Sequence, residues 1–313
     1  MKKVGVGLNI FFLIACLSFV VWFQNHTELF GVNQHSRKLI GYMRGQHVYE
    51  KQDASSSVRL VFVSALHSSG QSQFTELWEV CENCVVEPEL SNLLFKMFTE
   101  VGSIPAYFGL KTKVMEKMNS LKQKYEGQDV SIVLNTAPNT STMPYPASLK
   151  KDDYPKHPDL NRLAHLARKA SLDLRIIVIV RDAPHVMKQL QNTQRNMIFG
   201  YNAREFVDLC EIQIAQLLDI DPKYYVCWDH NDPVNEETLK KIGDHIDFKS
   251  SGGDLVAVGK KIFREDVPPG TLSSAQNSMI DFYRICVDNL RELCEDKPES
   301  LSKEYFSNGP WSR

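Results

Sequence analysis

The chain has 313 residues, of which 43% are hydrophobic and 24% are charged, and its formal net charge is -2. This balance is that of an ordinary globular protein with enough apolar content for a sizeable core. It gives no support for nucleic acid as a bulk partner, although a local cationic face for a small polyanion is compatible with a neutral total.

The N-terminal segment predicts a membrane anchor. Residues 4–23 form an uncharged apolar run of 20 residues, which is long enough to cross about 30 Å of hydrocarbon as a helix. Lys2 and Lys3 precede the run, and no Lys or Arg follows until Arg37, so we expect a cytoplasmic tail at 1–3 and a lumenal remainder. A cleaved signal peptide is the alternative, but the run ends in VVWFQNH, which is a poor cleavage site.

The next segment, residues 24–57, is polar and rich in His, Gln and Ser, which is typical of a stem rather than a packed domain. We therefore expect the globular domain to occupy 58–313. Asn25 and Asn139 lie in Asn-X-Ser/Thr sequons, which carry glycans only on the lumenal side.

The cysteine count is compatible with disulfides. Six of the seven cysteines follow the apolar run, and their pairing is left open by the sequence. The CENC pair would also suit redox chemistry or zinc, but no second close Cys or His pair completes a metal site. We predict no metal. The six are Cys81, Cys84, Cys210, Cys227, Cys286 and Cys294.

Short, nearly all-apolar, β-branched runs alternate with helical patterns along the domain. This alternation predicts an α/β fold with a central parallel sheet and right-handed crossovers. The predicted strands begin at 58 and then lie at 84–87, 130–135, 174–180 and 224–228. The predicted helices run through Glu76 and then over 90–101, 110–125, 160–170, 204–218, 236–246 and 274–294.

The first predicted strand ends in a small-residue loop, SALHSSGQS. The amides of 68–72 could wrap an anion as a nest in front of a helix N-terminus, and Gly70 permits a positive φ or a close backbone approach. The alternative is an ordinary turn in which Ser72 caps the helix. The loop lacks the Gly-Lys-Ser/Thr ending of an ATP or GTP site, which disfavours a P-loop kinase or NTPase.

A later strand ends in RDAPHV. There Arg181 is placed to grip a phosphate with two hydrogen bonds, while Asp182 caps the helix that enters through Pro184 or orients the arginine. The alternative is a structural Arg–Asp pair at a helix start.

Taken in order, these motifs resemble the Golgi carbohydrate sulfotransferases, in particular the branch that sulfates the 6-hydroxyl of galactose, N-acetylgalactosamine or N-acetylglucosamine. SSGQSQFTEL is similar to the family's first loop and helix, CVVEPEL to a strand ending in Glu-Pro-Leu, and IVRDAPHV to a strand ending in Arg-Asp-Pro-Arg. TLSSAQNSMIDFYRIC has the outline of the family's last helix. The resemblance covers about residues 58–294 together with the anchor and stem.

The resemblance implies a P-loop-like three-layer sandwich that binds 3′-phosphoadenosine 5′-phosphosulfate without a metal. It implies that the first loop holds the 5′-phosphosulfate and that Arg181 holds the 3′-phosphate. Gln189 stands where the family has a phosphate-binding Ser, and Arg284 could approach the donor from the last helix. The predicted loop contacts are Ser68, Ser69, Gly70, Gln71 and Ser72.

The implied reaction is in-line attack of a sugar hydroxyl on sulfur, for which Glu87 is the candidate general base. His67 could donate to the phosphosulfate, and in its protonated form it could replace the cation that the family has where this chain has Ser68. We expect a single-pass type II protein of the Golgi membrane with a glycan acceptor, and monomer or homodimer is left open. The alternative is a degenerate member that binds a glycan, a nucleotide or a protein partner without sulfate transfer.

Overall fold

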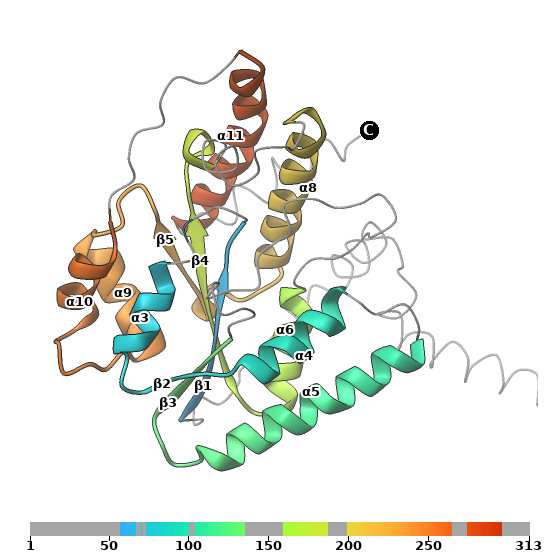
Figure 1. Cartoon of the computed structure of the whole chain (residues 1–313), viewed down its shortest axis with the longest axis vertical. Helices are drawn as coiled ribbons and strands as arrows, with labels where there is room; N and C mark the ends of the chain where they lie inside the picture. Colours follow the sequence, from blue (N-terminus) through green and yellow to red (C-terminus); the bar gives the residue numbers. More distant parts are fainter. Residues whose placement is uncertain are drawn as a thin grey trace, which may run out of the picture. The chain divides into compact units, whose positions relative to one another are not determined.

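The fold is built on a five-stranded parallel sheet with the strand order β2-β3-β1-β4-β5 (Figure 1). β1 pairs with β3 on one side and with β4 on the other. β1 and β4 are almost entirely buried, as expected for strands that helices cover on both faces. The strands are β1 (Val58–Ser64), β2 (Cys84–Val86), β3 (Val130–Val133), β4 (Asp173–Val180) and β5 (Tyr225–Asp229).

The computed structural model describes residues 57–66, 70, 73–99, 104–134, 159–186, 199–264 and 274–295. The predicted tail, anchor and stem and both sequons lie outside these residues, so they stay predictions. Within the described residues, no helix combines the length and the apolar character that a membrane crossing requires.

Three helices cover one face of the sheet: α3 (Gln73–Val80), α9 (Glu236–Ile246) and α10 (Leu255–Ile262). Their buried side chains meet the sheet around Trp228 of β5. The Phe74 ring contacts Trp228 edge-on at 5.1 Å between centroids, and Phe263 lies 4.8 Å from it. This aromatic cluster joins the beginning of α3 to the end of α10.

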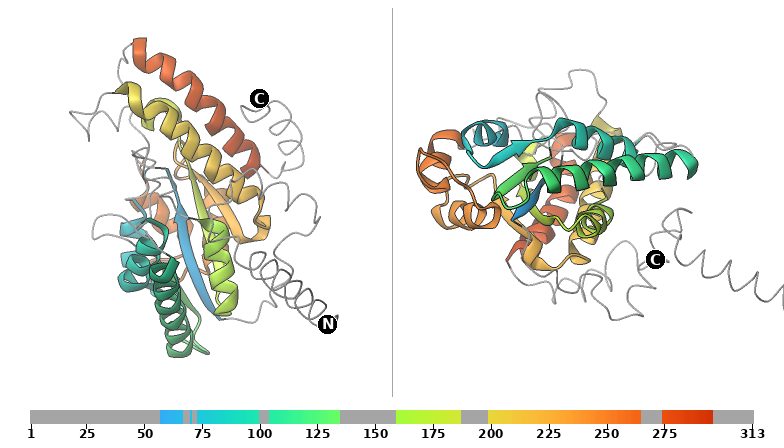
Figure 2. Two further views of the ribbon diagram at one scale, coloured as in Figure 1. Left: turned by 90° about the vertical axis from the view of Figure 1, so that its right-hand side faces the viewer. Right: turned by 90° about the horizontal axis from the view of Figure 1, so that it is seen from below.

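The other face is covered by the remaining long helices, with α8 and α11 side by side (Figure 2). The Gln213 amide of α8 donates to the Ser64 hydroxyl at 2.9 Å, a buried bond at the end of β1. The result is the predicted three-layer arrangement of helices, parallel sheet and helices. These helices are α4 (Pro88–Thr99), α5 (Ile104–Lys124), α6 (Leu160–Lys169), α8 (Phe199–Leu218) and α11 (Ser274–Cys294).

Disulfides attach α11 to its neighbours. Cys210 of α8 pairs with Cys286 of α11, and Cys227 of β5 pairs with Cys294 at the end of α11. The helix is therefore fixed both to the helical layer and to the sheet.

Most predicted elements are present, with shifted ends. The predicted bounds of α9 and α11 agree with the structure, whereas α5 begins at Ile104 rather than at 110, because Pro105 is tolerated in a first helical turn. α10 was not predicted. Its N-cap is Asp254, whose carboxylate accepts a hydrogen bond from the Ala257 amide at 2.9 Å.

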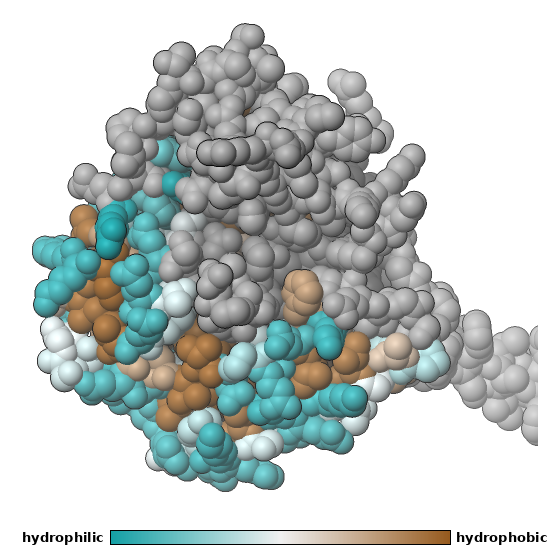
Figure 3. All heavy atoms as spheres, viewed as in Figure 1, coloured by the Kyte–Doolittle hydropathy of each residue, from teal (hydrophilic) through white to brown (hydrophobic). Residues whose placement is uncertain are grey.

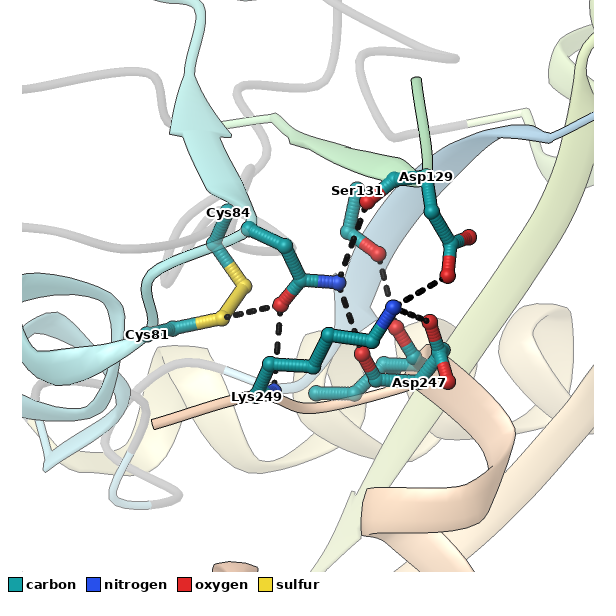
Figure 4. The surroundings of a disulfide bond; sticks show 8 residues. Cys81, Cys84, Asp129, Ser131, Asp247 and Lys249 are labelled. Atoms are coloured by element: carbon teal, nitrogen blue, oxygen red, sulfur yellow. Dashed lines mark hydrogen bonds and ion pairs between the residues drawn. A yellow bond between two sulfur atoms is a disulfide. The ribbon is translucent and has the colours of Figure 1, made fainter. Parts of the chain in front are cut away.

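The amino ends of the strands are cross-linked by polar side chains (Figure 4). The Asn83 amide donates to the backbone carbonyls of Asp129 and Asp247 at 3.3 and 2.7 Å, and its oxygen accepts from the Lys249 amide at 3.1 Å. A hydrogen bond to Asp247, the Lys249 ammonium and Arg59 hold the pKa of Asp129 well below its usual range. These contacts stabilise the edge of the sheet opposite the carboxyl ends.

The CENC motif lies at this same edge. Cys81 and Cys84 form a disulfide that closes the turn between α3 and β2. The Cys81 sulfur lies 3.4 Å from the Asn83 oxygen, which is a contact without a proton because a disulfide sulfur carries no hydrogen. The motif therefore closes a turn, and the described residues contain no group of three His, Cys, Asp or Glu side chains arranged to hold a metal.

Exposed apolar residues are scattered over the described surface. On the face drawn in Figure 3, hydrophobic patches are separated by polar side chains. The large exposed hydrophobic residues of the described chain are Val80, Val86, Phe95, Phe108 and Ile285.

Candidate functional site

The carboxyl ends of β1 and β4 lie side by side. Ser64 near the end of β1 is level with Val178 of β4. The chain then leaves β1 for α3 on one face of the sheet, whereas it leaves β4 for α8 on the other face. In parallel α/β sheets, such a switch point opens a crevice at the carboxyl ends where ligands bind. We take this edge as the candidate site.

Gly70 lies at this edge in a conformation that requires glycine. Its φ is +94°, which L-residues rarely adopt, as the sequence predicted for this position. A Cβ on Gly70 would lie 1.8 Å from Cδ2 of His230 and 2.0 Å from its Nε2. The Gln73 amide donates to the Gly70 carbonyl at 3.2 Å, which closes a tight turn in front of α3.

Gly70 packs directly against the His230 side chain. His230 follows β5, is 2% exposed, and donates its backbone amide to the Val180 carbonyl of β4 at 2.8 Å. Gly70 therefore packs against the residue that follows β5, next to the carboxyl end of β4.

The Gln73 side chain connects this imidazole to the end of α10. Its Oε1 accepts the backbone amide of Arg264 at 3.3 Å, and its Nε2 lies 3.3 Å from Nε2 of His230. Because the Gln73 amide oxygen is used as an acceptor, its Nε2 donates to Nε2 of the His230 ring. One side chain thus links the loop, the β5 tip and the segment after α10.

Arg181 follows β4, where the sequence placed it. It is 7% exposed, and it lies close enough to Tyr283 of α11 for its charge to affect the pKa of the Tyr283 phenol. Burial raises the pKa of the Tyr283 phenol, and the positive charge of Arg181 partly offsets that rise. Arg181 is thus a cation at the switch point with an aromatic neighbour.

Asp182 has a partner that the sequence did not suggest. Its carboxylate pairs with Arg291 of α11, which also contacts Asp229, the last residue of β5, at 3.4 Å. The Asp182 carbonyl accepts the His185 amide at 3.1 Å and so begins a helical turn. α11 thus supplies an ion pair to Asp182 and connects the carboxyl ends of β4 and β5.

Glu87 lies on the same edge but farther along it. It follows β2, and β3 stands between β2 and β1, so the β1 tip is roughly 10 Å away at the usual strand spacing. The Glu87 carboxylate is 3.4 Å from the Lys117 ammonium, which also contacts Glu89 at 2.5 Å. Hydrogen bonding to Glu89 and the charge of Glu87 raise the pKa of Lys117, so this cation is charged at neutral pH.

The remaining predicted residues are distributed differently. Arg284 lies on α11 with its side chain 59% exposed and 3.9 Å from Asp281, whereas the neighbouring Tyr283 is the α11 residue that interacts with Arg181. The predicted donor contact of Arg284 stays untested. The other predicted residues lie outside the described part of the chain: His67, Ser68, Ser69, Gln71, Ser72 and Gln189.

Sequence reasoning did not identify the residues that hold this edge together. His230 had a signal, because the polar run DHND directly follows a predicted strand. Tyr283 had none, since a buried aromatic residue at helical spacing is typical of core. Others are identified only by their contacts, namely Gln73, Arg264 and Arg291.

Together the sheet order and the switch point define an open parallel α/β protein whose candidate ligand-binding edge lies at the carboxyl ends of β1 and β4. No protein-family model matches the chain, and no curated protein gives a significant match. Among solved structures, the sulfotransferase domain of the Synechococcus PCC 7002 olefin synthase is 12% identical with a TM-score of 0.37, covering 75% of this chain and 98% of that chain.

A second solved structure, from the PezAT chromosomal toxin–antitoxin system of Streptococcus pneumoniae, is 11% identical with a TM-score of 0.26. That match covers 83% of this chain and 96% of that chain. Both similarities are too distant to define a family or an activity for this protein.

Proposed function

We propose that this protein transfers sulfate from 3′-phosphoadenosine 5′-phosphosulfate to a hydroxyl of a glycan, namely a 6-hydroxyl of a hexose or N-acetylhexosamine. The supporting observation is that the Gly70 loop and Arg181 follow adjacent parallel strands at a switch point. Two anion-binding features about one strand spacing apart suit the two ends of one bisphosphorylated adenosine.

In this proposal each end of the donor has its own contacts. The N-terminus of α3 and the loop around Gly70 favour the 5′-phosphosulfate, because helix N-termini present unpaired amides and a positive dipole end. Arg181 offers a planar guanidinium to the 3′-phosphate. The donor then lies across the ends of β1 and β4.

The reaction breaks one bond and forms one. The acceptor oxygen bonds to sulfur, the bond from sulfur to the bridging oxygen of the 5′-phosphate breaks, and 3′,5′-ADP leaves with that electron pair. We assign the acceptor proton to the carboxylate of Glu87, which follows β2 at the same edge of the sheet. Donors placed at the bridging oxygen lower the barrier most, because charge develops there.

The disulfides support a lumenal site of action. The structure pairs all six cysteines that follow the apolar run, and disulfides persist in oxidising compartments. Together with the predicted anchor at 4–23, this supports a type II protein whose domain lies in the Golgi lumen.

A second candidate is a protein of this fold that binds its ligands without transferring sulfate. Two observations favour it. The chain has no Lys or Arg from 65 to 73, and the candidate base Glu87 is in contact with an ammonium group of Lys117.

Incubation of the purified full-length chain with radiolabelled donor and a panel of glycans distinguishes the two. Transfer of label to any glycan, with 3′,5′-ADP as the second product, is the result expected for the enzyme. Binding of 3′,5′-ADP without transfer to any acceptor favours the second candidate. A chain that neither transfers sulfate nor binds 3′,5′-ADP refutes the enzyme and the nucleotide-binding form of the second candidate.

A further inference from the structure

The loop between β1 and α3 has no permanent cation of its own. Residues 65–73 contain neither Lys nor Arg, and His67 is a cation only when it is protonated, so a permanent positive charge for an anion bound there has to come from another part of the chain. Backbone amides and a helix N-terminus supply only partial charges. A full charge from outside the loop would strengthen the site most, because hydrogen bonds to ionised groups are about twice as strong as neutral ones.

Arg264 is the cation that the structure brings to this loop. Its backbone amide donates to Oε1 of Gln73 at 3.3 Å, and Gln73 itself closes the turn with the Gly70 carbonyl at 3.2 Å. Arg264 is thus one hydrogen-bonded side chain away from the loop. Its own side chain is exposed, and an arginine side chain is longer than the glutamine that forms this bridge.

Two neighbouring cations are paired with carboxylates. Arg291 contacts Asp182 and Asp229, and Lys260 pairs with Glu236. No ion pair involving the Arg264 side chain is found among the residues that the structure describes. Among the described residues, which end at Arg264 in this segment, no carboxylate is paired with its charge.

We propose that Arg264 supplies the charge for the 5′-phosphosulfate end of the donor and that Gln73 positions it. This assignment rests on the proposed function and identifies the residue that replaces the missing cation of the loop. A guanidinium can make two parallel hydrogen bonds to a phosphate or sulfate group. Arg264 then serves one end of the donor and Arg181 the other.

Gln73 fixes the loop and the arginine at the same time. Its Nε2 holds His230, which supports Gly70, while its Oε1 holds the backbone of Arg264. The side-chain amide of Gln73 thus sets the distance between the Gly70 turn and the backbone of Arg264. Gln73→Leu, which removes both hydrogen bonds and keeps every charge, is expected to weaken 3′,5′-ADP binding in the same direction as loss of the arginine.

Calorimetric titration of the full-length protein with two nucleotides tests the assignment. Adenosine 3′-phosphate lacks the 5′-phosphate that 3′,5′-ADP carries, so only the second ligand senses a contact at that end. Arg264→Ala is expected to weaken 3′,5′-ADP binding about 10- to 100-fold and to leave adenosine 3′-phosphate nearly unchanged. Arg264→Lys is expected to recover part of the loss.

Lys261→Ala is the matched control, because Lys261 is an exposed cation on α10 three positions before Arg264. It is expected to leave both affinities at their wild-type values. Equal losses for the two nucleotides, no loss in Arg264→Ala, or the same loss in Lys261→Ala would overturn the assignment while leaving the proposed function intact. A wild-type protein that binds neither nucleotide would overturn the proposed function and this assignment with it.

Discussion

Substitution of Gly70 by alanine tests the contact that most narrowly defines the candidate site. The new Cβ would lie 1.8 Å from Cδ2 of His230, and this ring is 2% exposed and lies 5.0 Å from Trp228. Overpacking of this kind costs about 1–3 kcal/mol. The φ of +94° adds about 1–2 kcal/mol for an L-residue. Gly70→Ala should therefore destabilise the protein by about 2–5 kcal/mol.

Thermal unfolding of the purified protein measures this effect, and Gly127 supplies the matched control. Gly127 also has a positive φ, of +74°, but an added Cβ there meets nothing within 4 Å. Gly127→Ala should cost only the backbone part, about 1–2 kcal/mol. At about 2–4 °C per kcal/mol, Gly70→Ala should lower Tm by roughly 4–20 °C, and Gly127→Ala by clearly less.

A double mutant separates the two parts of the cost at Gly70. In the His230→Ala background the ring is absent, so Gly70→Ala should become less destabilising by about the overpacking cost of 1–3 kcal/mol. Two results would contradict this contact. One is that Gly70→Ala destabilises the protein no more than Gly127→Ala does. The other is that the destabilisations by Gly70→Ala and His230→Ala simply add in the double mutant, which would mean that Gly70 does not pack against His230.

Three further predictions concern catalysis, the disulfides and pH. Glu87→Gln should lower the sulfate-transfer rate about 10²- to 10⁴-fold if Glu87 is the base, while Glu89→Gln, which alters the neighbouring exposed carboxylate, should stay near wild type; equal losses would argue against the role. Replacing both Cys227 and Cys294 by alanine should lower the unfolding free energy in denaturant titrations by about 4 kcal/mol, because the bond closes a loop of sequence separation 67. Burial lowers the pKa of His245 from 6.5 to about 4, so the folded protein binds fewer protons there than the unfolded chain. Stability should therefore fall as pH drops from 6.5 towards 4, by on the order of 3 kcal/mol, and a His245→Gln protein that keeps the same pH slope would contradict this assignment.

The sequence predicted the elements of the fold better than their arrangement. Runs of apolar β-branched residues identify β1 and β4 because both faces of these strands are buried. The bounds of α9 follow from its amphipathic pattern and from Asn235, whose side chain caps the first turn. The strand order could not be read in the same way, because β1 pairs with strands that follow it by many residues, and no local pattern encodes that choice.

The residues of the candidate site also fall into two groups: those with a local signal in the sequence and those defined by long-range contacts. Gly70 and Arg181 were recognisable, because a glycine in a strand-to-helix loop and an arginine at a strand tip carry local signals. The contacts of Gln73 join residues 157 and 191 positions apart, to His230 and Arg264. Such pairs depend on how the layers pack, so they become visible only in the folded chain.

The charges at the tips of β4 and β5 explain why a distant arginine matters for a polyanionic ligand. Arg181 and Arg291 stand there with Asp182 and Asp229, and Arg291 also lies 3.7 Å from Asp288 of α11. These three carboxylates outnumber the two arginines, so binding of an anion at this edge would depend on the placement of Arg181 rather than on net charge. A donor with several negative charges therefore gains most from a cation that no carboxylate of this edge neutralises, and in the described chain Arg264 is placed to provide it.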